Sequence, residues 1–416
     1  MMTYGIHPVE GVALAARIFT TSLLVGYVFR LLMLARGALH REPPPRVGAR
    51  YTEHQALVSV LIPAYNEERV IWASINALLA SNYKSLQVIV VDDGSRDLTA
   101  SIVARAFGND SRVTLVRRPH NGGKSSALNA GLEVADGEYI VVMDADTVPD
   151  VDFIGRMLQP LQQDRADAVA GNVKVSTGAG LITSCQRIEY VSVLNSTRLF
   201  QGCTGNITTI AGAAGAMRRS TLRAVGGYSS NTKAEDADLT LRLAHNGFRL
   251  LYVRDAIVHT EVPSSWRGLF YQRVRWIYGN LQCIGSHLRR KGALVGTRMS
   301  GFPVFAYENT FKAPVEFLRA SVPFGVALGW LPIDVLYGYS GLFLLFFISV
   351  EVAFAVENEP PPGFPDLVAY YSVWPIFFIL PYSAAAWKFL TGANVTWRQE
   401  ARRGVLAQRE RARPRL

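Results

Sequence analysis

The segment Val142-Met143-Asp144-Ala145-Asp146 places two carboxylates, with one residue between them, at the end of a short apolar run. Two anions held this close repel each other unless a cation lies with them. Mg²⁺ or Mn²⁺, bound by one or two carboxylates together with the phosphates of a substrate, supplies that cation. The pattern predicts a metal site at Asp144 and Asp146, and a pair of solvated loop aspartates is the alternative.

A second pair of carboxylates, Asp92 and Asp93, ends another apolar run and is followed by Gly94 and Ser95. At the end of a strand these carboxylates can accept hydrogen bonds from a ligand. The alternative is that Ser95 or Asp97 caps the helix that follows. The residues themselves leave both interpretations open.

The segment Asn121-Gly122-Gly123-Lys124-Ser125 resembles a phosphate-binding loop but lacks the full spacing of one. Its two glycines expose backbone N–H groups at the start of a predicted helix, where anions bind. The Lys124 ammonium adds a point charge suited to a pyrophosphate.

Two further groups of polar residues lie on predicted helices. Glu235 and Asp236 begin one helix, where acidic residues are also common for dipole reasons alone. Gln272, Arg275 and Trp276 are spaced i, i+3 and i+4, which puts them on one helical face. An amide, a guanidinium and an indole on one face suit a substrate, and the Trp276 ring offers a face for stacking. The alternative is an aromatic and cationic face at a membrane surface.

The elements that must position these residues are short apolar runs, which alternate with amphipathic stretches typical of helices. Runs of this length that are rich in β-branched residues fit buried parallel strands. The predicted strands are Val58–Ile62, Gln87–Val91, Val113–Val116 and Tyr139–Met143. Their alternation with helices favours an α/β fold with a doubly wound, mostly parallel sheet. Ligands of such sheets bind beyond the carboxyl ends of the strands, where the polar segments lie.

The apolar segments outside this domain predict a membrane protein. Gly11–Leu34 is long enough to span a bilayer if Arg17 and Arg30 extend toward the headgroups, and no cleavage site for a signal peptide follows it. Val335–Val356 and Val368–Leu390 are two further predicted spans. The segment near Ser321–Leu336 is a candidate for another.

These patterns predict a chain organised in six segments. They are an N-terminal transmembrane helix (1–40), a basic Pro-rich linker (41–55), the α/β domain (56–262), amphipathic helices in the plane of the membrane interface (263–332), C-terminal transmembrane helices (333–392) and a basic cytoplasmic tail (393–416). The acidic loop 357–367, which contains no Arg or Lys, is expected on the outer side of the membrane.

The net charge of +10 is concentrated in two short segments. Residues 30–50 contribute +4 (five Arg, one Glu) and residues 398–416 contribute +5 (seven Arg, two Glu). Each follows an apolar run, as cytoplasmic loops do. The charge therefore indicates membrane topology and argues against nucleic-acid binding. Three cysteines without metal-ligand spacing predict no disulfide framework.

The order of these motifs resembles the processive branch of glycosyltransferase family 2, which includes cellulose, chitin, hyaluronan and poly-N-acetylglucosamine synthases. Asp-Asp-Gly-Ser, Gly-Gly-Lys, Asp-x-Asp, Glu-Asp and Gln-x-x-Arg-Trp occur in the family's order over roughly residues 56–290. The resemblance implies a GT-A, Rossmann-like domain on the cytoplasmic side of the membrane, with interfacial and transmembrane helices.

In that family the residue matching Asp93 contacts the uracil of the donor. The segment matching Pro63, Tyr65 and Glu67 lines the nucleotide pocket, and the residue matching Lys124 lies near the nucleotide. These five residues are therefore the expected nucleotide site, together with the metal-binding Asp-x-Asp motif.

The resemblance assigns the metal to Asp144 and Asp146 and the role of catalytic base to Asp236, next to Glu235. The family's Gln-x-x-Arg-Trp motif lies beside the acceptor and the pyrophosphate. Ala234 replaces the family's usual Thr before the acid pair, which stays intact. The acceptor loop of cellulose synthases has no counterpart near Gly212–Gly215, which makes cellulose a less favoured product.

The expected activity is transfer of N-acetylglucosamine or glucose from a UDP-sugar to a growing β-linked glycan, at the plasma membrane and with Mg²⁺ or Mn²⁺. A glycan or lipid acceptor, the bilayer and an export or accessory subunit are the expected partners. One alternative is a transferase that adds a single sugar to a membrane lipid. Another is a non-catalytic scaffold of an export complex, although such domains usually lose their carboxylates.

Overall fold

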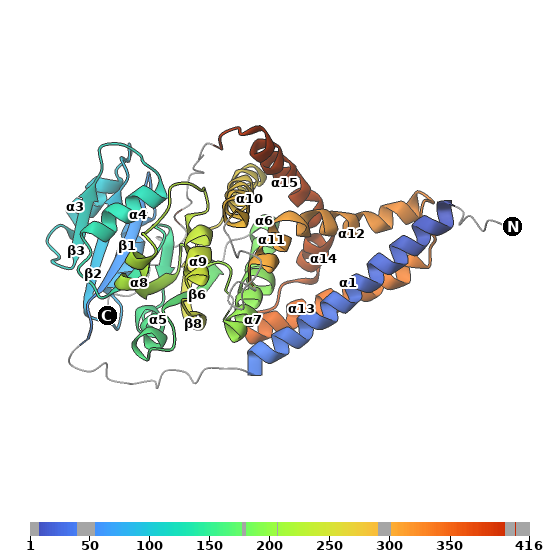
Figure 1. The fold of residues 1–416 in the computed structure, drawn as a ribbon, viewed down its shortest axis with the longest axis horizontal. Helices are drawn as coiled ribbons and strands as arrows, with labels where there is room; N and C mark the ends of the chain where they lie inside the picture. The colour runs from blue at the N-terminus through green and yellow to red at the C-terminus, as the bar shows by residue number, and fades with distance from the viewer. Residues whose placement is uncertain are drawn as a thin grey trace.

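The computed structural model describes residues 8–39, 55–176, 180–205, 207–289, 301–395 and 404. An α/β domain built on one eight-stranded sheet lies at one end, and long apolar helices extend from it (Figure 1). The predicted linker, apart from Gln55, and most of the predicted tail fall outside the described residues.

The first half of the sheet is parallel and has the spatial order β3-β2-β1-β4. Its strands are β1 (Val58–Ala64), β2 (Leu86–Asp92), β3 (Val113–Arg117) and β4 (Tyr139–Val142). The connecting helices are α2 (Ile71–Leu79), α3 (Thr99–Phe107) and α4 (Lys124–Glu133). All four predicted strands are present within two residues of their predicted ends. Their carboxyl ends meet at one edge, which brings the polar segments together.

The second half of the sheet is mixed and continues the order as β4-β7-β6-β8-β5. Its strands are β5 (Thr147–Pro149), β6 (Ala168–Val175), β7 (Gly215–Arg218) and β8 (Leu250–Thr260). β7 runs antiparallel to both of its neighbours, and β5 is antiparallel to β8. The expectation of a mostly parallel sheet thus holds for the first half only. β7 is a four-residue strand without an apolar run, so no sequence pattern indicated the strand or its antiparallel direction.

The sheet is buried on both faces, which explains the continuous apolar runs. Successive side chains of a strand point to opposite faces. Val60 and Ile62 therefore pack into one core cluster, and Leu61 packs into the other. All three side chains are fully buried.

Helices follow and flank the sheet. They are α5 (Phe153–Gln162), α6 (Leu181–Glu189), the π-helix η1 (Tyr190–Asn195), α7 (Ser196–Thr204), α8 (Arg219–Ala224), α9 (Glu235–His245), α10 (Trp266–Leu288), α11 (Gly301–Thr310) and α12 (Lys312–Ala327). The remaining ones are α1 (Pro8–Leu39), α13 (Val335–Val356), α14 (Phe364–Ser372) and α15 (Trp374–Thr391). The helix predicted to carry Gln272, Arg275 and Trp276 is present as α10.

Among the described residues, three helical segments are long and apolar enough to cross a membrane: Gly11–Leu39, Val335–Val356 and Phe364–Thr391. α1 and α13 lie side by side and extend away from the sheet (Figure 1). A Cβ on Gly338 would lie 2.7 Å from Cγ2 of Thr20. A small residue at this point lets the two backbones approach closely, as in other membrane helix pairs.

The loop between α13 and α14 packs on the α/β domain, so the expectation that it lies on the opposite side of the membrane is wrong. Asn172 of β6 donates to Glu357 (2.6 Å). Glu359 forms ion pairs with Lys174 (3.0 Å) and Arg187 (3.1 Å). The acidic residues of this loop neutralise cations of the domain, and a charge count of the loop alone could not reveal those partners.

α15 lies alongside α10. Trp266, at the start of α10, has its ring centroid 4.9 Å from that of Phe377. Near the other end the rings of Tyr278 and Phe389 are 6.4 Å apart. α14 packs against α6 of the domain. The segment 364–391 is thus in contact with helices of the domain along its length, whereas α1 and α13 extend away from it.

Candidate active site

A cavity of about 430 Å³ lies where the carboxyl end of β4 meets α9, α10 and the apolar helices α1, α12 and α15. Its lining includes eight of the residues predicted from the sequence. They are Lys124, Asp144, Asp146, Glu235, Asp236, Gln272, Arg275 and Trp276. The segments that carry them are up to 150 residues apart in the chain, and the fold brings them to one space.

The Lys124 ammonium joins the carboxylates of two different segments. Its Nζ lies 2.6 Å from Oδ1 of Asp144 and 3.1 Å from Oε1 of Glu235. Burial would lower the pKa of Lys124, but Asp144, Glu235 and the nearby Asp236 hold that pKa above its ordinary value. Lys124 is therefore charged at neutral pH and screens three carboxylates from one another.

Asp236 lies in the first turn of α9 and is held by two backbone groups. The N–H of Ala237 donates to Oδ1 (2.8 Å), and the N–H of Gly212 donates to Oδ2 (3.3 Å). Burial and the neighbouring Glu235 raise the pKa of Asp236 above its usual value, opposed by Lys124 and the two N–H groups. A partly buried carboxylate with raised proton affinity has the properties of a general base.

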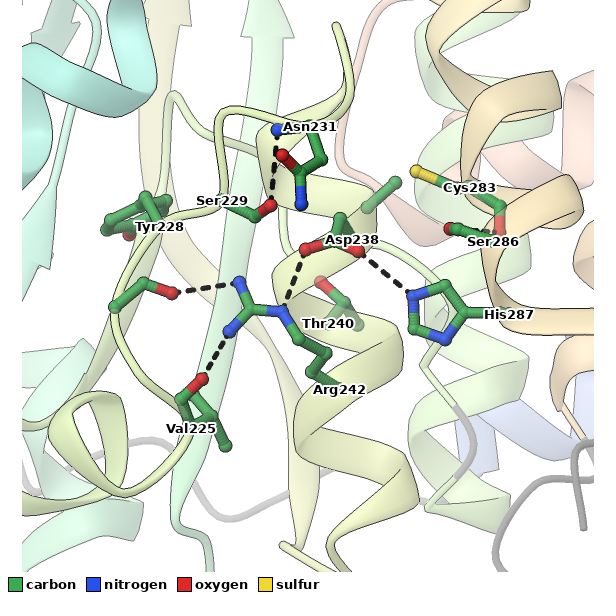
Figure 2. Close-up of polar contacts among 12 residues, drawn as sticks. Val225, Tyr228, Ser229, Asn231, Asp238, Thr240, Arg242, Cys283, Ser286 and His287 are labelled. Atoms are coloured by element: carbon green, nitrogen blue, oxygen red, sulfur yellow. Dashed lines mark hydrogen bonds and ion pairs between the residues drawn. The ribbon is translucent and has the colours of Figure 1, made fainter. Parts of the chain in front are cut away.

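A buried ionic cluster ties α9 to α10 (Figure 2). Asp238 accepts from Nε of Arg242 (2.7 Å) and contacts Nε2 of His287, at the end of α10, at 3.0 Å. Arg242 also donates to the carbonyl of Gly227, in the loop before α9. The cluster fixes the helix that carries Asp236 against the helix that carries the Gln-x-x-Arg-Trp motif.

The face of α10 that was predicted to meet the substrate lines the cavity, but Trp276 is partly covered. The guanidinium of Arg273 lies 4.2 Å from the centroid of the Trp276 ring and is paired with Glu189 (2.6 Å). One ring face is therefore occupied by a cation, and the expectation of a free stacking face needs this correction. Arg273 was missed because it occupies the first unspecified position within the motif, outside the i, i+3 and i+4 spacing.

Of the five residues expected at the nucleotide, Lys124 lines this cavity and the other four do not, as far as the described residues show. They are Pro63, Tyr65, Glu67 and Asp93. Asp93 is buried and accepts from the N–H groups of Gly122 (3.1 Å) and Gly123 (2.8 Å) and from Arg118 (2.5 Å). It therefore holds the glycine loop in place. These residues occupy the carboxyl ends of β1 and β2, beside the strand that carries the Asp-x-Asp motif. Their contact with a nucleotide stays a prediction.

The cavity also contains residues that the sequence gave no reason to combine. It extends past Arg198, Glu308 and Lys312 to Tyr27 of α1 and Trp374 of α15. Trp374 is buried, and its indole N–H has no hydrogen-bond partner among the described residues. These residues come from five separate helices, so only the tertiary arrangement joins them.

The carboxylates present fit a hard divalent cation. Within the described residues no group of three or more His, Cys, Asp or Glu side chains is placed to hold a metal. Asp144 and Asp146 supply oxygen ligands only, and Asp144 already contacts the Lys124 ammonium. A site with two carboxylates suits Mg²⁺ or Mn²⁺ that takes its remaining ligands from phosphates and water.

Comparison with known proteins agrees with this geometry. Residues 59–226 match the model of glycosyl transferase family 2. This segment is a glycosyltransferase domain of that family. The glycosyltransferase domain includes the glycine loop and the Asp-x-Asp motif, whereas α9 and α10 lie beyond the matched residues.

Two curated relatives are named poly-β-1,6-N-acetyl-D-glucosamine synthase. The protein from Staphylococcus epidermidis is 31% identical over 261 residues, which cover 62% of this chain and 62% of the relative. The protein from Staphylococcus aureus (strain COL) is 30% identical over 223 residues, which cover 53% and 54%. The chain thus spans between half and two thirds of the length of these relatives.

A solved structure shows the same fold. The mannosyltransferase PcManGT from Pyrobaculum calidifontis, in complex with GDP-Man and Mn²⁺, has a TM-score of 0.60 at 20% identity. The alignment covers 91% of this chain and 100% of that structure. The predicted GT-A fold is confirmed.

Gly279 of α10 is required for the close approach of α10 to α9. A Cβ there would lie 2.6 Å from the backbone N of Ala234, whereas a Cβ on Gly285 would meet only the ring of Phe389, at 3.4 Å. Alanine improves a helix by up to about 1 kcal/mol, and overpacking costs about 1–3 kcal/mol. We expect Gly279→Ala to lower the thermal unfolding temperature in detergent and Gly285→Ala to preserve or raise it. Equal stability of the two variants would contradict this interpretation of the α9–α10 contact.

Proposed function

We propose that this protein is a membrane-embedded, inverting glycosyltransferase that adds N-acetylglucosamine from a UDP-sugar to a growing β-linked glycan. Glucose is the second choice of sugar. The observation that carries the proposal is the cavity, which unites the Asp236 carboxylate, whose pKa is raised, with the Asp-x-Asp motif and the Gln-x-x-Arg-Trp helix. The names of the staphylococcal relatives favour N-acetylglucosamine.

In the proposed reaction Asp236 removes the proton from the acceptor hydroxyl as that oxygen attacks the anomeric carbon. General-base help of this kind contributes about 10²–10⁴-fold to a rate. One displacement inverts the anomeric centre, so an α-linked donor gives a β-linked product. The N–H groups of Gly212 and Ala237 fix the carboxylate, which keeps its orientation constant during the transfer.

The leaving diphosphate requires positive charge. Asp144 and Asp146 would hold Mg²⁺ or Mn²⁺, which when bound supplies part of that charge. Lys124 and Arg275 line the same cavity and provide the remainder as fixed cations. The nucleotide would lie at the carboxyl ends of β1 and β2, along Pro63, Tyr65, Glu67 and Asp93.

The acceptor would enter from the side of α10. Gln272, Arg275 and Trp276 face the cavity there, and Tyr27 and Arg30 of α1 extend the lining toward the apolar helices. A cavity that reaches a candidate membrane span also accommodates a lipid-linked acceptor. This observation makes a single-addition glycolipid transferase the second candidate.

For the membrane topology, we propose that the glycosyltransferase domain lies on the cytoplasmic face of the plasma membrane. Because the 357–363 loop packs on that domain, it belongs on the same face. The turn at 328–334 lies at the far end of α13, with Trp330 exposed. An exposed Trp at that end fits the opposite interface, where aromatic residues gather.

The function is tested with purified protein in detergent, supplied with UDP-sugars and Mg²⁺ or Mn²⁺, and the products are sized by mass spectrometry. We expect a ladder of products from UDP-N-acetylglucosamine, and its loss on chelation of the metal. Asp236→Asn should retain nucleotide binding by calorimetry and lose transfer by at least about 10²-fold.

Addition of a single sugar to a lipid would instead support the second candidate, a glycolipid transferase. Absence of turnover with every donor would leave a non-catalytic scaffold. Transfer at the wild-type rate by Asp236→Asn would remove Asp236 from the role of base.

The pH dependence of transfer follows from the raised pKa of Asp236. A base must be deprotonated, so the rate falls as the pH drops through that pKa, and the acid limb lies above the range of an ordinary Asp. Burial and the Glu235 anion both raise the pKa of Asp236, and Glu235→Gln removes the second cause, so the acid limb should move to lower pH. The readout is the position of this limb in kcat/KM, and a shift to higher pH contradicts the assignment.

The topology is tested by cysteine accessibility in intact cells, in a background whose native cysteines are replaced. We expect Trp330→Cys to react with a membrane-impermeant maleimide added outside, and Gly363→Cys to react only after the membrane is opened. Reaction of both from outside would place the 357–363 loop away from the cytoplasm.

A further inference from the structure

Two buried amide side chains connect the π-helix η1 to the central sheet. Asn195, the last residue of η1, is fully buried and donates to Oδ1 of Asn172 (2.8 Å) and to the carbonyl of Val173 (3.1 Å). Buried polar side chains are costly unless their partners are met. A single π-helical turn within a longer helix is rare and is frequent at functional sites.

Asn172 extends this connection to the end of a candidate membrane span. Its Nδ2 donates to Oε2 of Glu357 (2.6 Å) and to the carbonyl of Arg254. Glu357 directly follows α13 and is only 4% exposed. The buried side chains of Glu357, Asn172 and Asn195 therefore form a hydrogen-bonded series from the end of α13, through β6, to η1.

In the other direction the connection reaches the cavity. Arg198, one turn beyond Asn195, donates to Oδ1 of Asn195 (3.3 Å) and to the carbonyl of Thr209 (3.3 Å). Thr209 belongs to the loop before β7, and in the same loop Gly212 donates to Asp236. Arg198 thus supports the loop whose backbone holds the carboxylate proposed as the base, and its own side chain lines the cavity.

We propose that Glu357, Asn172, Asn195 and Arg198 form a polar relay through which the end of α13 positions the loop that holds Asp236. The relay makes Glu357 and Asn195 positioning residues for sugar transfer. Neither is among the described residues that line the cavity. This inference rests on the proposed function, because its consequence is a change in the transfer rate.

The relay has a matched control in the same loop. Glu359 also joins the loop after α13 to the domain, through Lys174 and Arg187, but its contacts do not continue to Asn195. Loss of Glu359 weakens the docking of the loop and leaves the relay complete. Burial raises the pKa of Glu357, so its neutral isostere glutamine is a close substitute that still accepts from Asn172.

The experiment measures kcat and KM for the UDP-sugar, with nucleotide binding by calorimetry, on the full chain in detergent. We expect Glu357→Ala to lower kcat by about 10- to 100-fold, the range caused by small misplacements of reacting groups. KM and nucleotide affinity should stay at the wild-type values. Glu357→Gln should restore kcat, and Glu359→Ala should retain it.

Arg198→Lys is the second variant, because it keeps the charge at a partly exposed position and cannot hold Asn195 and Thr209 together. It should lower kcat without lowering nucleotide affinity, even if Glu357→Ala does not fold. The relay is refuted if Arg198→Lys keeps wild-type kcat, if Glu359→Ala loses as much as Glu357→Ala, or if Glu357→Gln fails to restore the rate. Absence of turnover in the wild-type protein refutes the proposed function, and the relay with it.

Discussion

The balance of charge around Lys124 is the constraint on which the site depends. Four carboxylates, from the segment after β4 and the start of α9, converge on one cavity, and without a cation their repulsion would separate the two segments. The Lys124 ammonium contacts Asp144 and Glu235 directly and stabilises the ionised Asp236. This lysine begins α4, directly after a glycine loop that Asp93 holds in place. A buried carboxylate far from the chemistry thereby decides where the central cation lies.

The same principle, a buried charge matched by a specific partner, joins the layers of the molecule. Asp238 pairs with Arg242 and His287 and so fixes α9 against α10. Glu357 and Glu359, which follow α13, bind Asn172 and Lys174 of the domain and so fix α13 against it. Leaving one partner of such a pair alone in the interior is costly, so each pair permits little relative movement. The site is therefore built from helices and strands whose relative positions are set by such pairs, and the candidate membrane span α13 belongs to that framework.

Local patterns predicted the first half of the sheet because buried parallel strands have continuous apolar runs, and the short length and β-branched residues of these runs favour strands over buried helices. They could not predict β7, whose four residues carry no such run. The charge pattern failed at loop 357–367 for a related reason. An acidic loop without cations is typical of an outer loop when it faces solvent, but Lys174 and Arg187 lie on segments far away in the chain. Sequence rules for topology count the charges of a loop and cannot see what neutralises them.

The sequence by itself determined the chemical types and their order: Asp-x-Asp after a buried strand, a lysine after two glycines, an acid pair at a helix start, and Gln-x-x-Arg-Trp on one helical face. Each of these is a short-range pattern, fixed by backbone geometry within a few residues. Only the tertiary structure decided that they share one cavity, that Arg273 covers a face of Trp276, and that Asp93 supports the glycine loop. Those facts depend on contacts between residues far apart in the chain, which are selected by packing and charge pairing in three dimensions and leave no local pattern.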